Sequence, residues 1–273
     1  MEAETLSEAR VYVGVYGKYN NGSLFGAWLD LSDYSDKEDF YEASREFRND
    51  EEDADDLVRD FKDEYQGQYD DEEDFAYQIV EDSSIMGSNP IECVSPVLTG
   101  KAGMKSLETC CKALNEANAQ VNRSTGLHVH IGAQNLSDEA YINVFKNYQK
   151  LERIIDTFMA RSRRANNSRW CRTLQGYDFT WCTTKSDILD AMNGNRYFKV
   201  NACSYSRHRT IEFRQHQGST DFEKISNWVN FCAKLVAWSK KNVLSSEVSS
   251  IDEIPFLTAK EKSFFKSRAE VLA

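Results

Sequence analysis

No stretch of the sequence is apolar enough to cross a membrane. The mean hydropathy is -0.61, and no apolar run approaches the roughly 18 residues that a transmembrane helix needs. The first ten residues, Met1 to Arg10, are acidic and lack the apolar stretch of a secretory signal peptide. We therefore expect a cytoplasmic protein with no membrane partner.

Common catalytic and metal-binding motifs are also missing. The chain contains no P-loop, no G-x-G-x-x-G fingerprint, no G-x-S-x-G elbow and no H-E-x-x-H helix. Its 7 cysteines are an odd number and none forms a C-x-x-C pair. Free thiols in a reducing compartment are the plain expectation for such a chain.

Acidic residues are concentrated at the start of the chain. Residues 1–84 carry 26 Asp/Glu and 7 Lys/Arg, whereas residues 85–273 carry 18 and 26. The densest stretch, residues 50–74, holds 14 acids and 2 bases, with apolar residues four apart. This pattern is typical either of a helix with an acidic outer face or of a solvated linker. The charge asymmetry predicts two domains, 1–74 and 75–273.

Apolar periodicity predicts two long helices, at residues 137–164 and 221–242, with Ser137 as the N-cap of the first. Shorter helices are expected at residues 35–48, 104–118 and from residue 259. Strands are expected at residues 11–16, 24–31, 75–80, 91–97, 126–132, 197–204 and 209–217. Strands and helices do not alternate in βαβ order, so the predicted class is α+β: a small acidic N-terminal α/β subdomain, then an antiparallel sheet packed with long helices.

Polar side chains share one face of two expected strands. His128 and His130 are two residues apart in GLHVHIG, and Glu212, Arg214 and His216 alternate in TIEFRQHQ. Imidazole and carboxylate groups bind divalent cations, and a guanidinium binds phosphate through two parallel hydrogen bonds. The pattern indicates either a metal and phosphate site or the solvent-facing side of an antiparallel sheet.

Other polar residues are weaker candidates. Glu92 lies in a short strand between two prolines, Asp82 lies in the preceding turn, and Arg196 could bind an anion. Residues 161–172 contain five arginines, which is typical either of a basic helix end or of a phosphate or nucleic-acid patch.

Residues from about 75 to 244 resemble the amidoligase family, whose relatives include glutamine synthetase and glutamate–cysteine ligase. The resemblance rests on several motifs in order: EDSSI from Glu81, PIECVSPVLTG from Pro90, TGLHVHIGA from Thr125, RSRxxN from Arg161, NRYFKVN from Asn195, TIEFRQHQGST from Thr210 and WVNF from Trp228. It implies a glutamine-synthetase-like curved antiparallel sheet that binds ATP and Mg²⁺ on its concave face. The implied reaction activates a small-molecule or peptide carboxylate as an acyl phosphate, which an amine then attacks.

The same resemblance implies roles for individual residues. The implied metal ligands are Glu92, His128, His130 and Glu212. The implied catalytic residues are Arg214, Arg196, His216 and Asn201. Of these, Arg196 and Arg214 also bind the phosphate or carboxylate groups, while His216 and Asn201 shape the site.

One family feature is not found. Amidoligases of this type begin with a strand of the form G-x-E-x-E, and no such strand is evident before residue 75; residues 11–16 have strand character but no acid. The loss of two carboxylates is expected to weaken cation binding. The domain is then inactive, uses a different metal set, or binds nucleotide without ligating anything.

Residues from about 10 to 60, beginning VYVGVYGKYNNGSLFGAWLDL at Val11, resemble the first subdomain of ArdA-type antirestriction proteins. These are acidic DNA mimics of mobile elements that occupy the DNA groove of type I restriction–modification enzymes.

The two resemblances together lead to two alternative functions for the chain. The first is a ligase joined to an acidic domain in a mobile-element or phage counter-defence setting. The alternative is a non-catalytic DNA mimic whose residues 50–74 bind a host nuclease complex. In both, the N-terminal block is not expected to bind nucleic acid directly.

Overall fold

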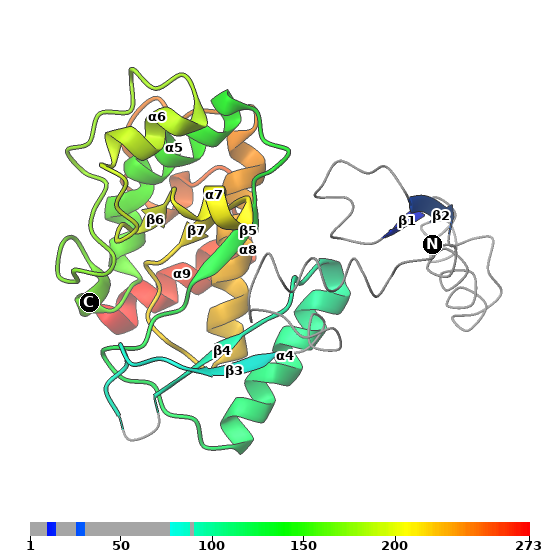
Figure 1. Ribbon diagram of the computed structural model, residues 1–273. Helices are drawn as coiled ribbons and strands as arrows, with labels where there is room; N and C mark the ends of the chain where they lie inside the picture. Colours follow the sequence, from blue (N-terminus) through cyan, green and yellow to red (C-terminus); the bar gives the residue numbers. More distant parts are fainter. Residues whose placement is uncertain (1–9, 15–25, 31–76, 88–89) are drawn as a thin grey trace. The chain divides into compact units, whose positions relative to one another are not determined.

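The computed structural model describes residues 10–14, 26–30, 77–87 and 90–273 (Figure 1). The chain divides into two compact units, Met1–Gln78 and Ile79–Ala273. In the first unit, strands β1 (Arg10–Gly14) and β2 (Gly26–Asp30) pair in antiparallel fashion. The helix expected at residues 35–48 and the acidic stretch 50–74 lie outside the described residues.

The second unit contains helices and short strands, which confirms the α+β class. Its α-helices are α4 (Gly100–Glu116), α5 (Asp138–Thr157), α6 (Lys185–Ala191), α7 (Ser204–His208), α8 (Phe222–Ser239) and α9 (Ala259–Leu272). Two 3-10 turns are η2 (Arg161–Arg163) and η3 (Ile251–Glu253). In the part of the chain that the structure describes, no helix is long and apolar enough to span a bilayer.

Helix α5 begins where its cap predicts and ends earlier than expected. The Ser137 hydroxyl accepts a hydrogen bond from the Ala140 amide at 3.1 Å, so Ser137 is the N-cap. The helix stops at Thr157, and the arginines that the sequence placed in its last turn lie beyond it, in η2 and the following loop. The expected range 137–164 was therefore wrong at its C-terminal end.

The strands are shorter than the sequence predicted. β3 (Gln78–Glu81) pairs with β4 (Ile91–Val94), and β5 (Val129–Gly132), β7 (Thr210–Phe213) and β6 (Val200–Asn201) form a three-stranded antiparallel sheet in that order. Helix α7 takes the end of the expected strand 197–204, and Arg209 turns the chain back with a left-handed φ of 54°. The described strands belong to three small sheets, whereas the resemblance implied one curved sheet.

The core lies between α5, α8 and the inner face of the three-stranded sheet. The apolar positions predicted for α5 are buried, as are Ile211 and Phe213 of β7. Aromatic rings pack along and between the helices. The ring centres of Trp228 and Phe231, both on α8, lie 5.2 Å apart, and those of Phe158 and Phe265 lie 4.5 Å apart. Burial of such side chains contributes about 1.5–3 kcal/mol each. This core fixes the sheet whose outer face carries the candidate site.

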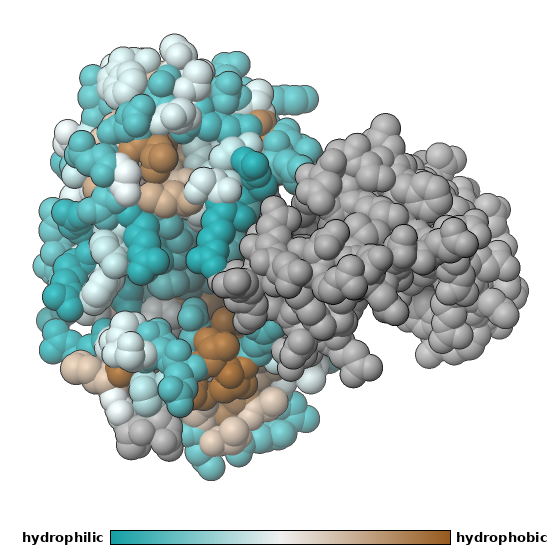
Figure 2. Space-filling model, viewed as in Figure 1, coloured by the Kyte–Doolittle hydropathy of each residue, from teal (hydrophilic) through white to brown (hydrophobic). Residues whose placement is uncertain are grey.

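Apolar residues are also exposed on part of the surface. Figure 2 shows a mostly hydrophilic face with apolar residues gathered low in the described unit, where Figure 1 places β3, β4 and α4. The exposed side chains of this region include Ile79, Val80, Ile91, Val94 and Val97.

A buried ion cluster joins α5 to the sheet. Lys199 precedes β6 and is fully buried, and its Nζ lies 2.8 Å from Glu152 and 2.6 Å from Asp156 of α5. Gln215 donates to Asp156 at 2.5 Å and accepts a hydrogen bond from the Tyr148 hydroxyl. The ammonium group compensates the buried carboxylate of Glu152 and the partly buried carboxylate of Asp156.

We expect Lys199→Met to lower the free energy of unfolding by about 3–5 kcal/mol, because it leaves the buried Glu152 and the partly buried Asp156 without a cation. Urea denaturation measures the change. The matched control is Lys105→Met, which removes an exposed lysine paired with Glu108 and should change stability by less than about 1 kcal/mol. Equal unfolding midpoints for the two variants would contradict a stabilising role for the cluster.

Candidate functional site

The candidate site is built around the carboxylate of Glu212. Glu212 lies in the central strand β7, directly opposite His130 of β5 and Asn201 of β6. The side chain is buried, and its two oxygens face several nitrogen atoms. Arg214 Nη1 donates to Oε1, His128 Nδ1 lies 3.3 Å from the same oxygen, and Asn201 Nδ2 donates to Oε2 at 2.5 Å.

These neighbours keep Glu212 ionised. Burial by itself raises the pKa of the carboxyl group, but Arg214, His128 and the hydrogen bond from Asn201 together outweigh it and lower the pKa below its usual value. Asn201 is oriented in turn, because its Oδ1 accepts the Cys203 amide at 2.8 Å and its NH₂ group is left for Glu212. The site therefore holds one fixed negative charge at neutral pH.

The two histidines of β5 and its N-terminal flank are neutral at that pH. Burial and the positive charge of Arg214 lower the pKa of His128 from 6.5 to about 4, although Glu212 acts in the opposite direction. Burial also lowers the pKa of His130, whose Nε2 is 3.9 Å from Glu212 and whose Nδ1 is 2.8 Å from the Thr210 hydroxyl. A neutral imidazole keeps a lone pair that can accept a proton or bind a metal.

A buried arginine lies behind His128. Arg163 donates from Nη2 to the Thr125 carbonyl, and its guanidinium passes close to Gly126. A Cβ at Gly126 would lie 3.1 Å from Arg163 Nη2 and 3.3 Å from His128 Nε2, so glycine lets the two side chains approach. Arg163 could not be singled out from the sequence, because nothing in RSRxxN distinguishes a buried arginine from its exposed neighbours.

The electrostatic field of the cluster reaches Glu92 of β4. Burial raises the pKa of Glu92, and the charges of Asp82 and Glu212 raise it further while Arg214 lowers it. Asp82 follows β3, and its carboxylate accepts the Ser84 amide at 2.8 Å. Glu92 therefore shares the field of Glu212, although among the described residues no hydrogen bond or ion pair joins its carboxylate to the cluster.

Arg196 and His216 differ in their relation to this cluster. Arg196 is exposed, and its guanidinium lies 5.1 Å from the Tyr197 ring, which is 6.0 Å from the guanidinium of Arg214. His216 instead packs into the core, where it stacks on Trp228 at 5.8 Å. β7 ends at Phe213, so the expected alternation does not carry His216 to the face of Glu212.

Burial lowers the pKa of His216 to about 4, and its Nδ1 lies 2.6 Å from the Gln217 carbonyl. The ring is thus neutral and donates to that carbonyl at neutral pH. Its contacts are with the strand end and α8, and Glu212 is not among the charged groups that influence it.

The described residues do not by themselves fit the expected magnesium site. Among them, no three His, Cys, Asp or Glu side chains form a group that could hold a metal ion. The Glu212 carboxylate is already paired with Arg214, whose positive charge opposes a second cation. Mg²⁺ also prefers oxygen ligands, whereas two of the four expected ligands, His128 and His130, are imidazoles.

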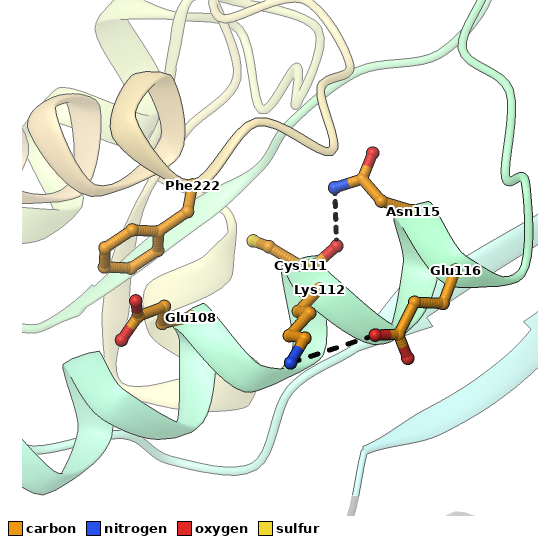
Figure 3. Close-up of a pocket in the computed structure, with 6 residues that line it drawn as sticks. All are labelled: Glu108, Cys111, Lys112, Asn115, Glu116 and Phe222. Atoms are coloured by element: carbon orange, nitrogen blue, oxygen red, sulfur yellow. Dashed lines mark hydrogen bonds and ion pairs between the residues drawn. The ribbon is translucent and has the colours of Figure 1, made fainter.

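The structure also has a surface hollow away from this cluster, between α4 and α8 (Figure 3). Its volume is about 520 Å³, and it is lined by Glu108, Cys111, Lys112, Asn115, Glu116 and Phe222. Asn115 bonds across to Thr220, and Lys112 pairs loosely with Glu116 at 3.9 Å. None of the residues that the sequence singled out for chemistry lines this hollow.

Comparison with known proteins identifies the class. Residues 28–178 and 174–236 match the model of a family described as "Putative amidoligase enzyme". These matches span more than half of the chain and include every residue that contacts Glu212, so the chain belongs to the amidoligase family. No curated protein and no solved structure matches the chain.

The family match begins inside β2. Its first residue, Trp28, stands between Gly26 and Asp30 in the strand GAWLD. This strand has the glycine and the final acid of the G-x-E-x-E spacing, with tryptophan at the middle position. Neither position carries a glutamate, so the absence of a G-x-E-x-E strand before residue 75 stands as expected from the sequence. The resemblance of residues 10–60 to ArdA-type proteins, and the partner expected for residues 50–74, stay predictions.

The pKa of the His128 ring is predicted to depend on the positive charge of Arg214. We expect the His128 ring to titrate at about pH 4 in the wild type. In Arg214→Met its pKa should rise, because a repelling cation is lost and Glu212 attracts the imidazolium more freely. NMR of the histidine ring protons measures both values. An unchanged His128 pKa would contradict the proposed coupling, and Arg153→Met, an exposed arginine paired with Glu247, is the control.

The lowered pKa of His128 also makes the stability of the folded protein depend on pH. The folded pKa of His128 lies below its ordinary 6.5, so the unfolded chain binds more protons between the two values. Its contribution to stability is therefore complete above about pH 6.5 and is lost as the pH falls toward 4.

Proposed function

We propose that this protein is a carboxylate–amine ligase that uses Mg·ATP as a substrate. The observation that carries the proposal is the family match, which includes the whole cluster around Glu212. Ligation of this kind needs one region that binds carboxylate and phosphate groups and another that receives an amine. The cluster offers positive and negative groups side by side.

The arginines provide the anion-binding region. Arg214 uses Nη1 for Glu212 and Nε for the Trp170 carbonyl at 3.4 Å, while among the described residues its Nη2 makes no hydrogen bond. Arg196 is exposed, and its one hydrogen bond among these residues is a 3.3 Å contact from Nη2 to the Tyr197 hydroxyl. The remaining N–H groups suit a carboxylate or phosphate, since guanidinium binds both in a bidentate manner.

Glu212 and the histidines provide the amine region. Glu212, already paired with Arg214, orients His128 through the 3.3 Å contact with its Nδ1. The neutral rings of His128 and His130 have lone pairs that can accept the proton an attacking amine must lose. Asn201 acts through Glu212, because its hydrogen bond fixes the orientation of that carboxylate. His216 supports the sheet from its place against Trp228.

Magnesium enters this proposal with ATP. Bound to the phosphates, Mg²⁺ neutralises charge that develops during phosphoryl transfer. Among the described residues there is no separate metal site for it.

Calorimetric titration with Mg·ATP tests the proposal. We expect wild-type binding in the micromolar range and at least about tenfold weaker binding, or about 1.4 kcal/mol, in the double variant Glu212→Gln, His128→Ala. Glu139→Gln, at an exposed position of the first turn of α5, is the control. If the wild type does not bind Mg·ATP, the ligase proposal is wrong.

We also propose that residues 50–74 bind a basic surface of a defence nuclease, in the counter-defence setting expected from the sequence. The 14 acids and 2 bases of this stretch support the proposal, since phosphate-binding grooves attract dense negative charge.

We expect the full chain to inhibit DNA cleavage by a purified type I restriction enzyme, and to inhibit it less at high salt. Changing the five acids of residues 70–74 to amides should relieve inhibition; equal inhibition by both proteins would rule out this surface.

A further inference from the structure

Several arginines rest on aromatic rings beside the Glu212 cluster. We call this group the arginine patch and define it as Arg169, Trp170, Arg172, Arg196 and Tyr197. Arg169, Trp170 and Arg196 are exposed, and the other two are partly buried. The sequence drew attention to Arg196 and to the arginines of residues 161–172 separately, and the fold brings members of both segments together.

Backbone hydrogen bonds place the patch next to the site. The Arg172 amide donates to the Tyr197 carbonyl at 2.8 Å, and the Lys199 amide donates back to the Arg172 carbonyl at 2.9 Å. The Arg214 amide then donates to the Lys199 carbonyl at 2.8 Å. The segment around Arg172 thus continues the sheet beyond β6, and it carries its arginines to the neighbourhood of Arg214.

Ring contacts hold the guanidinium groups in place. The Arg169 guanidinium lies 4.4 Å from the Trp170 ring centre, and that of Arg196 lies 5.1 Å from the Tyr197 ring centre. The two rings meet edge to face at 5.0 Å. Stacked arginines lose less freedom when they bind an anion, because the planar groups are already oriented.

The positive charges of the patch are not compensated. Within residues 77–87 and 90–273, no carboxylate forms an ion pair with Arg169, Arg172 or Arg196, whereas Arg214 is paired with Glu212. The Nε atom of Arg172 is buried and has no hydrogen-bond partner among the same residues. Three unpaired guanidinium groups on one surface favour a ligand with several negative charges.

The ring geometry distinguishes between possible polyanions. Single-stranded nucleic acids bind by stacking their bases on free aromatic faces. Here arginine side chains already cover a face of Trp170 and a face of Tyr197. The rings serve to orient guanidinium groups, whose free edges match carboxylates.

We propose that the arginine patch binds an acidic peptide, and that this peptide is the carboxylate substrate of the ligase. Side-chain carboxylates of the peptide pair with Arg169, Arg172 and Arg196, while one further carboxylate reaches Arg214 beside Glu212. The identity of the reacting carboxylate rests on the proposed function; binding of the peptide does not, because it needs no ATP.

Fluorescence anisotropy with a labelled hexaglutamate peptide tests the inference on the full chain without ATP. We expect the double variant Arg169→Gln, Arg196→Gln to raise the Kd at least about tenfold, with a smaller dependence on salt. Arg153→Gln is the charge-matched control, because this exposed arginine lies on α5 and pairs with Glu247; it should bind the peptide like the wild type. The variant Arg169→Lys, Arg196→Lys keeps the charge without the planar fork and should bind with intermediate affinity.

Three results would overturn the inference: no peptide binding by the wild type, equal loss in the control, or tighter binding of a single-stranded oligonucleotide of the same charge. The ligase proposal is judged separately by adding Mg·ATP and an amine and measuring amide formation by mass spectrometry. Peptide binding without ligation leaves the patch assignment intact and counts against the enzyme. Ligation of free glutamate without peptide binding supports the ligase proposal and contradicts the assignment of the arginine patch.

Discussion

The buried ion pairs of Lys199 are the interaction on which the rest of the second unit depends. They connect α5, the longest described helix, to the segment that enters β6. The Lys199 backbone in turn bonds to Arg172 on one side and to Arg214 on the other. A single buried ammonium group therefore fixes the positions of the helix, the sheet and the arginines that surround Glu212. Buried charges of this kind tolerate few alternative arrangements, because each one left without a partner costs several kcal/mol.

The long helices could be predicted from the sequence, and the short strands only in part. The period of the apolar residues in α5 and α8 reflects burial along one face, which is a local property of the chain. Strand ends depend on partners that are distant in sequence. Helix α7 fills the gap between the two strands expected at residues 197–204 and 209–217, and the Ser204 hydroxyl at its start donates to the Thr210 carbonyl at 2.8 Å.

The candidate site, too, could be predicted from the sequence only in part. Alternation along single strands correctly brought Glu212 and Arg214 to one face and indicated His128 and His130 as their neighbours. It failed for His216, which lies beyond the end of β7 and packs on Trp228. Arg163 was missed because its burial depends on the approach of the Gly126 backbone, which no local pattern reveals.

The brevity of β6 has a consequence for how the site can vary among related sequences. Two residues, Val200 and Asn201, form this strand, so its ladder contributes few backbone hydrogen bonds and side chains supply most of the attachment. Substitutions in the flanking loops can therefore shift the arginines without dismantling the sheet, whereas replacement of Asn201 would leave the Glu212 carboxylate held through Oε1 alone. Substitutions that change which ligand is bound are therefore compatible with this scaffold in the flanking loops, whereas substitutions in the ion pairs of Lys199 and Glu212 are not.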